Sequence, residues 1–107
     1  MSDRGSSSTA AEPGALREDF RRRAHALIPG GCHTYAKGDD QYPIGPPGFI
    51  ARGKGCHVWD LEGRRYIEYG MGNRAVGLGH AHPAVIEAAT EALQFGCNFS
   101  RASPLEV

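Results

Sequence analysis

Three short strand patterns joined by glycine turns constrain the fold of this chain more than any other feature. "FIAR", "CHVWD" and "RRYIEYG" follow one another between residues 49 and 70, separated by "GKG" and "LEG". This spacing predicts a three-stranded antiparallel meander, with Gly63 at a tight turn that needs a positive φ. In the last strand Tyr66 and Glu68 face one side, and the other side carries Arg65, Ile67 and Tyr69. So small a sheet has open faces and edges, so it needs a cover.

Helical patterns stand on both sides of the meander. Ala15 to Ile28, "ALREDFRRRAHALI", places one apolar stripe on Leu16, Phe20, Ala24 and Leu27, and "PGG" ends the helix. "HPAVIEAATEALQFG" predicts a second helix with Pro83 at its first position and Gly96 as its C-cap. Its expected apolar face consists of Val85, Ala89, Ala92 and Leu93. Between the first helix and the meander, residues 30–48 are predicted to form an irregular loop.

Composition limits what the chain can do alone. Leu, Ile, Val and Phe together number only 19 of 107 residues, so we expect a thin core that rests on another surface. The net charge is zero, which argues against binding nucleic acid or a membrane surface through bulk charge. Residues 1–13 are predicted to be a disordered tail. The polar N-terminus, the lack of a long apolar run and three widely spaced cysteines favour a cytoplasmic protein with free thiols.

Few side chains in this sequence indicate chemistry directly. Arg74, preceded by Asn73 in a flexible glycine-rich stretch, could grip a carboxylate or phosphate, or could be an ordinary surface arginine. Lys37 in the loop leaves the same two possibilities open. Neither Lys37 nor Lys54, the only lysines, has an evident setting that would make it a Schiff-base nucleophile. From these residues alone we find no complete active site.

Two local motifs concern helix ends. His80 and His82 form an HxH pair that could bind a metal, but no third and fourth ligand stands at a useful spacing, so we expect them to support the start of the second helix. "SPLE", from Ser103 to Glu106, is a capping box with proline at the first helical position. It predicts a helix that begins where the given sequence ends.

Three segments in this order resemble one family: "LIPGG", "FIARGKGCHVWDLEGRRYIEY" and "LGHAHPAVIEAATEAL". They are similar to the N-terminal part of class III pyridoxal-phosphate (PLP) aminotransferases, with the glutamate-1-semialdehyde 2,1-aminomutase-like proteins as the nearest subgroup. The resemblance covers about residues 24–107. It implies an α/β fold of the fold-type-I PLP enzymes, a homodimer, and amino-group transfer between an amino compound and a keto or aldehyde acceptor.

The resemblance also implies what this chain lacks. Residues 14–107 correspond to an N-terminal segment that stops before the cofactor-binding domain, so catalytic and cofactor-binding residues have no matching positions here. We expect PLP to belong to the full-length family and not to bind this fragment alone. The alternative is a small interaction module that docks on, or complements, a separately encoded aminotransferase chain.

Two family motifs can be carried over by position. An Asn-Ser-Pro-Val-Arg run, whose arginine helps to hold the substrate carboxylate, aligns with His33-Thr34-Tyr35-Ala36-Lys37, which puts Lys37 in place of the arginine. A Ser-Trp-Gly run near the substrate aligns with Gly72-Asn73-Arg74. These departures imply a different amino or keto substrate. The substrate-binding candidates are therefore His33, Tyr35, Lys37, Asn73 and Arg74.

Overall fold

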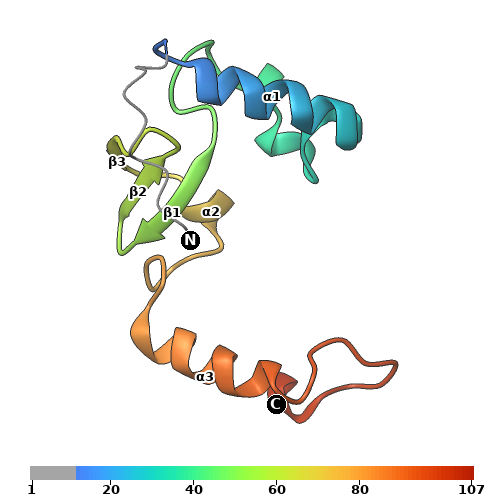
Figure 1. Cartoon of the computed structure of the whole chain (residues 1–107). Coiled ribbons are helices and arrows are strands. Elements are labelled where there is room, and N and C mark those ends of the chain that lie inside the picture. Colours follow the sequence, from blue (N-terminus) through green and yellow to red (C-terminus); the bar gives the residue numbers. More distant parts are fainter. Residues whose placement is uncertain (1–11) are drawn as a thin grey trace, which may run out of the picture. The chain divides into compact units, whose positions relative to one another are not determined.

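The computed structural model describes residues 12–107 (Figure 1). Most of the predicted tail, residues 1–11, lies outside the described residues, and Glu12 already accepts a hydrogen bond from the N–H of Ala15 at 3.0 Å. The elements are α1 (Ala15–Leu27), the 3₁₀ turns η1 (Pro29–Gly31), η2 (Tyr35–Lys37) and η3 (Asp39–Gln41), β1 (Ile50–Lys54), β2 (His57–Asp60), β3 (Arg65–Ile67), α2 (Met71–Arg74), α3 (Pro83–Leu93) and η4 (Pro104–Glu106). The predicted order of helix, loop, meander and helix is confirmed.

The chain divides into two compact units. The first consists of the chain up to Arg52 together with Val58–Tyr66, and the second of Gly53–His57 together with Ile67–Val107. Within residues 12–107, no helix is both long and apolar enough to cross a membrane.

The three strands form an antiparallel sheet in the order β1-β2-β3, as predicted. The hairpin between β2 and β3 closes through the N–H of Asp60, which donates to the carbonyl of Arg64 at 3.0 Å. Gly63 has the positive φ, 82°, that the turn requires. Tyr66 and Glu68 are half-buried, whereas their neighbours in β3 are exposed, so the predicted alternation of faces is confirmed.

Within the first unit, helix α1 makes aromatic and charged contacts with residues that follow it in the sequence. The rings of Phe20 and Phe49 lie 5.9 Å apart between centroids. Arg17 reaches the hairpin turn, where its guanidinium lies 3.5 Å from the carboxylate of Glu62. Phe20, from the apolar stripe of α1, thus contacts the segment that leads into β1, and the charged side chain of Arg17 contacts the turn that follows β2.

Two details differ from the sequence prediction. The predicted irregular loop, residues 30–48, contains two 3₁₀ turns, η2 and η3. Gly96 is not the C-cap of α3, because the α-helix ends at Leu93 and Gln94 takes that position. After Leu93 the chain continues with 3₁₀-type hydrogen bonds, in which each N–H donates to the carbonyl three residues earlier. Gly96 makes the last of these bonds, to the carbonyl of Leu93 at 3.3 Å, and its φ of 89° ends the helical path.

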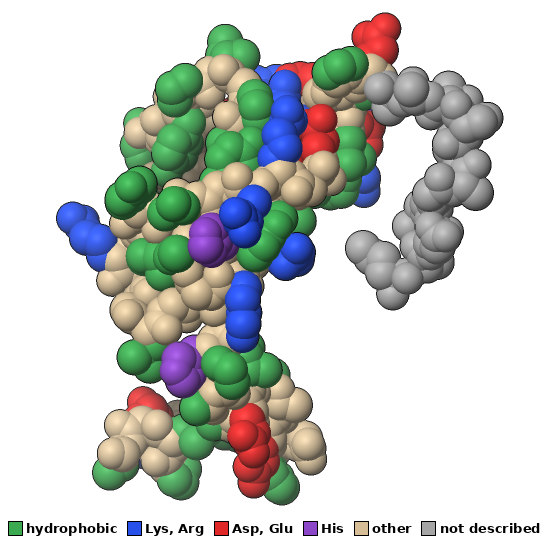
Figure 2. Space-filling model, turned by 90° about the vertical axis from the view of Figure 1, so that its left-hand side faces the viewer, with side chains coloured by type: hydrophobic (Ala, Val, Ile, Leu, Met, Phe, Trp, Pro, Cys, Tyr) green, Lys and Arg blue, Asp and Glu red, His purple; other side chains and the backbone are tan. Residues whose placement is uncertain are grey.

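The core of the described chain is very small. Val58, 4% exposed, is the one hydrophobic side chain buried within residues 12–107. Large apolar side chains such as Tyr35, Ile44 and Phe95 are exposed, and green apolar atoms are spread over the face shown in Figure 2. Hydrophobic burial is the main stabilising contribution in most folds. The described residues bury very little apolar surface among themselves, so this contribution is small here.

Candidate functional site

The loop after α1 brings three of the predicted site residues together. His33, Tyr35 and Lys37 are all exposed, and Tyr35 keeps 77% of its surface accessible. The N–H of Lys37 donates to the carbonyl of Thr34 at 2.9 Å, which closes the turn η2. The Thr34 hydroxyl is 2.6 Å from Nδ1 of His33. The loop thus presents a phenol and an ammonium group from one hydrogen-bonded turn, and an imidazole from the residue just before its N-cap.

Side-chain bonds hold this loop in shape. The Cys32 thiol donates to the carbonyl of Thr34 at 3.0 Å, and the Tyr42 hydroxyl donates to the carbonyl of Ala36 at 3.0 Å. These bonds connect Cys32 and Tyr42, which flank the candidate residues, to the backbone of the stretch between them. The loop is therefore shaped by its own contacts, although its candidate side chains are exposed.

Asp39 connects the same loop to α1. Its Oδ2 lies 2.6 Å from Nε of Arg21 and 3.0 Å from Nε2 of His25. The hydrogen bond with His25, helped by the one from Arg21, lowers the pKa of the Asp39 carboxyl below its ordinary 3.8. We did not predict a role for Asp39 from the sequence. The available signal was an acidic pair soon after a helix rich in arginine and histidine.

The other two predicted site residues lie in α2, which is a single left-handed turn. Four consecutive residues have positive φ: Met71 (42°), Gly72 (61°), Asn73 (58°) and Arg74 (70°). The turn is closed by the N–H of Arg74, which donates to the carbonyl of Gly70 at 2.7 Å. The glycine-rich stretch therefore contains a hydrogen-bonded left-handed turn. Left-handed backbone costs about 1–2 kcal/mol for each residue with a Cβ, so such strain persists mostly at functional positions.

The five candidates thus form two sets. His33, Tyr35 and Lys37 share one loop of the first unit, and Asn73 with Arg74 shares one turn of the second unit. The structure brings the members of each set together. The assignment of all five residues to substrate binding stays a prediction.

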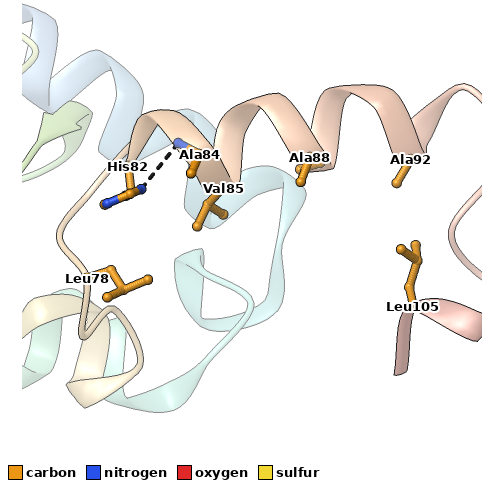
Figure 3. Close-up of a pocket in the computed structure, with 8 residues that line it drawn as sticks. Leu78, His82, Ala84, Val85, Ala88, Ala92 and Leu105 are labelled. Atoms are coloured by element: carbon orange, nitrogen blue, oxygen red, sulfur yellow. Dashed lines mark hydrogen bonds between the residues drawn. The ribbon is translucent and has the colours of Figure 1, made fainter. Parts of the chain in front are cut away.

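His82 acts at the start of α3, whereas His80 contacts the strand region that precedes it. Nδ1 of His82 accepts a hydrogen bond from the N–H of Ala84 at 3.3 Å, so His82 is the N-cap (Figure 3). Nε2 of His80 contacts the carboxylate of Glu68, and its backbone forms a two-bond bridge to Gly55. The predicted support of the helix start is confirmed for His82, whereas the contacts of His80 are with Glu68 and Gly55. The described part of the chain, residues 12–107, contains no group of three His, Cys, Asp or Glu side chains arranged to hold a metal ion.

The residues present do not fit covalently bound PLP. Lys54 is exposed, and its Nζ donates to the carbonyl of Ala81 at 3.4 Å. Lys37 is exposed on the loop. A lysine that forms a Schiff base needs a desolvated or cationic setting, which neither of these two has.

The capping box at the end of the chain is formed as predicted. The Ser103 hydroxyl accepts from the N–H of Leu105 at 3.2 Å, and the Glu106 carboxylate accepts from the N–H of Ser103. In this structure it heads a single 3₁₀ turn, η4.

Comparison with known proteins identifies the relatives of this chain. Residues 35–104 match the family described as Aminotransferase class-III. A glutamate-1-semialdehyde 2,1-aminomutase of Thermus thermophilus is 39% identical over 92 residues, which cover 86% of this chain and 22% of the relative. The chain therefore spans about a fifth of the length of the curated relatives it matches.

Solved structures agree with the sequence comparison. An omega-transaminase from Sphaerobacter thermophilus superposes with a TM-score of 0.67 at 29% identity, over 86% of this chain and 20% of that one. A transaminase with PLP bound gives a TM-score of 0.69 at 28% identity, over 85% and 20%. The helices and antiparallel sheet seen here are thus part of the α/β fold of PLP-dependent transaminases. The chain belongs to the class III aminotransferase family.

Proposed function

We propose that this chain supplies the N-terminal, substrate-facing part of a PLP-dependent enzyme that moves an amino group between a small amino compound and a keto or aldehyde acceptor. Its membership of the class III aminotransferases supports the reaction class. The single observation that supports a substrate-facing role is the exposed ammonium of Lys37 on a hydrogen-bonded loop. In this proposal PLP and its lysine lie outside residues 12–107.

Lys37 is proposed to hold a substrate carboxylate. A lysine is a compact point charge with three donors, whereas the arginine of the resembled motif offers a planar bidentate fork. The exchange therefore keeps the positive charge that attracts a carboxylate, but the ammonium contacts it as a point charge and without the bidentate geometry of a guanidinium. Tyr35 stands on the same turn and His33 shortly before it, and both are proposed as polar neighbours for the rest of the substrate.

Arg74 is proposed as a second anchor for an anionic group. It is exposed, and it is held at a φ of 70° that an arginine does not favour. Strain of this kind is retained when the surrounding structure gains from it. The complete enzyme is proposed to be a homodimer, as the family resemblance implies.

A chimera tests this function directly. The chain replaces the matched segment of the Thermus thermophilus relative, which provides the remaining part of the enzyme. We expect amino transfer from at least one amino acid in a panel of donors and acceptors. Lys37→Ala should raise KM for the acceptor about tenfold or more with a smaller change in kcat, because a ground-state anchor is lost.

Lys54→Ala is the matched control, since Lys54 is the other lysine and also exposed. It should leave KM unchanged. An active chimera in which Lys37→Ala and Lys54→Ala behave alike would contradict the role given to Lys37. A well-folded, PLP-loaded chimera without activity on any donor would contradict the proposed function.

A second candidate function is docking on a separate aminotransferase chain that carries the cofactor. The observation that favours it is a shallow apolar groove of about 380 Å³ along α3, where Leu78, Val85, Ala88, Ala92 and Leu105 face one open space (Figure 3). Since relatives are about five times longer, the remaining part of such an enzyme is the expected occupant.

Intact mass of the protein in its native cell separates the two functions. One long polypeptide that contains these residues supports the first. A mass near 11.5 kDa together with co-elution of a PLP-bearing chain supports the second. In that case Val85→Asp should abolish co-elution, whereas Ile44→Asp, at an exposed residue outside the groove, should not.

A further inference from the structure

We propose that Asp39 is a positioning residue whose carboxylate latches the loop of residues 29–42 onto α1 and thereby fixes how Tyr35 and Lys37 are presented. This inference rests on the proposed function in one respect: the substrate role of Lys37 and Tyr35 is taken from it. The latch itself can be tested without any substrate.

The geometry of the latch is a single oxygen shared by two donors from one helix. Oδ2 of Asp39 lies 2.6 Å from Nε of Arg21 and 3.0 Å from Nε2 of His25. Arg21 and His25 are four residues apart, so both side chains project from the same face of α1. The carboxylate therefore joins segments that are 18 and 14 residues apart in sequence.

Short backbone bonds carry this constraint from Asp39 to the candidate residues. Gln41 donates to the carbonyl of Gly38 at 3.0 Å, and Gly38 donates to the carbonyl of Tyr35 at 3.0 Å. Gly38 is buried, and a Cβ there would lie 3.2 Å from the Tyr35 carbonyl oxygen. Lys37 ends one tight turn and Asp39 begins the next, and only the buried Gly38 stands between them. If the carboxylate is released, these turns lose their attachment to the helix.

The charges around Asp39 support a latch of modest strength. Arg21 and His25 face it from α1, and Asp40 and Lys37 are its charged neighbours in the loop. All three members of the cluster are substantially exposed, and an exposed ion pair contributes little by itself. Two donors on one carboxylate form a small network, in which each donor helps to keep the other in place. The lowered pKa of Asp39 agrees with this arrangement.

Amide hydrogen exchange on the full 107-residue chain is the test. Asp39→Asn removes the charge that both donors contact. We expect about threefold faster exchange at the amides of Lys37, Gly38 and Gln41, with unchanged exchange in the middle of α1. Asp40→Asn is the matched control: it removes a neighbouring charge that forms no ion pair within residues 12–107, and it should leave the exchange unchanged.

A conservative variant and a pH series distinguish a latch from a general loss of structure. Asp39→Glu keeps the carboxylate and should restore most of the protection. In the unsubstituted chain, the protection factor of Gly38 should approach that of Asp39→Asn as the pH falls below 3.8, because a carboxylate with a lowered pKa loses its bonds only when it is protonated.

Equal exchange in the unsubstituted chain and in Asp39→Asn would overturn the latch, as would an equal acceleration by Asp40→Asn. A failed substrate role gives a different result. If Lys37→Ala leaves KM unchanged in the chimera while Asp39→Asn still accelerates exchange here, the latch stands and the proposed function of Lys37 does not.

Discussion

The hydroxyl of Tyr66 donates a hydrogen bond to Oδ2 of Asp60 at 3.0 Å, which joins the middle of β3 to the end of β2. The same carboxylate accepts from Nε of Arg64 at 3.1 Å and from the backbone N–H groups of Glu62 and Arg64, each at 2.9 Å. Asp60 is only 5% exposed. In a chain with almost no apolar core, this buried carboxylate with four donors organises the hairpin.

Replacing Asp60 by asparagine should destabilise the chain. An amide offers one acceptor oxygen, and its NH₂ group would face donors that the carboxylate now satisfies. We expect a loss of about 1–3 kcal/mol in the free energy of unfolding, measured by urea denaturation followed by circular dichroism. Tyr66→Phe removes one of the four bonds and should cost less. An equal effect of the two variants would contradict the central position of the carboxylate.

Stability should also fall in acid because of Asp60. Burial by itself would raise the pKa of this carboxyl, but the hydrogen bonds from Arg64, Tyr66 and Glu62 outweigh burial and lower it below 3.8. A lowered folded-state pKa means that the stabilisation is fully present above the unfolded value. It is lost as the pH falls through the folded value.

The measurement is the urea midpoint of the unsubstituted chain and of Asp60→Asn between pH 7 and pH 2. The difference between the two should be constant above about pH 5 and should shrink below the unfolded value near 3.8. Asp39 has a lowered pKa too, so Asp39→Asn is measured in parallel to separate its contribution. A difference that persists unchanged at pH 2 would contradict this assignment.

The left-handed turn of α2 makes Gly72 sensitive to substitution. Its φ is 61°, and a Cβ there would lie 2.7 Å from Cγ2 of Val76. Gly72→Ala should therefore reduce the free energy of unfolding by about 1–2 kcal/mol. Gly70→Ala is the matched control, because Gly70 has a φ of −73° and a Cβ there would meet nothing within 4 Å. It should be neutral or slightly stabilising.

Local patterns predicted most of the fold because they depend on neighbours in sequence. The meander, the positive φ of Gly63 and the capping box at Ser103 all follow from turn and cap chemistry within a few residues. The end of α3 was misjudged because a helix can tighten into 3₁₀ bonds before the glycine that stops it.

Contacts between distant residues could not be read from the sequence. The pairing of Asp39 with Arg21 and His25 requires the loop to fold back on α1, and no sequence period encodes that return. The left-handed backbone at Met71 and Arg74 also has no reliable local signal, because among these four residues only Gly72 and Asn73 favour it. The candidates at that turn came from the guanidinium of Arg74 in a glycine-rich stretch and from the family resemblance, not from backbone preference.

Arg74 offers a test in which stability and function should change in opposite directions. Arg74→Gly relieves the strain of a φ of 70° and should raise the free energy of unfolding by about 1 kcal/mol. In the chimera the same variant should raise KM for an anionic substrate, because the guanidinium is lost. Arg74→Ala is the control: it also loses the guanidinium but keeps a Cβ in the left-handed region, so KM should rise without the gain in stability. If Arg74→Gly stabilised the chain and KM stayed unchanged in both variants, the strain would be real and Arg74 would not be an anchor.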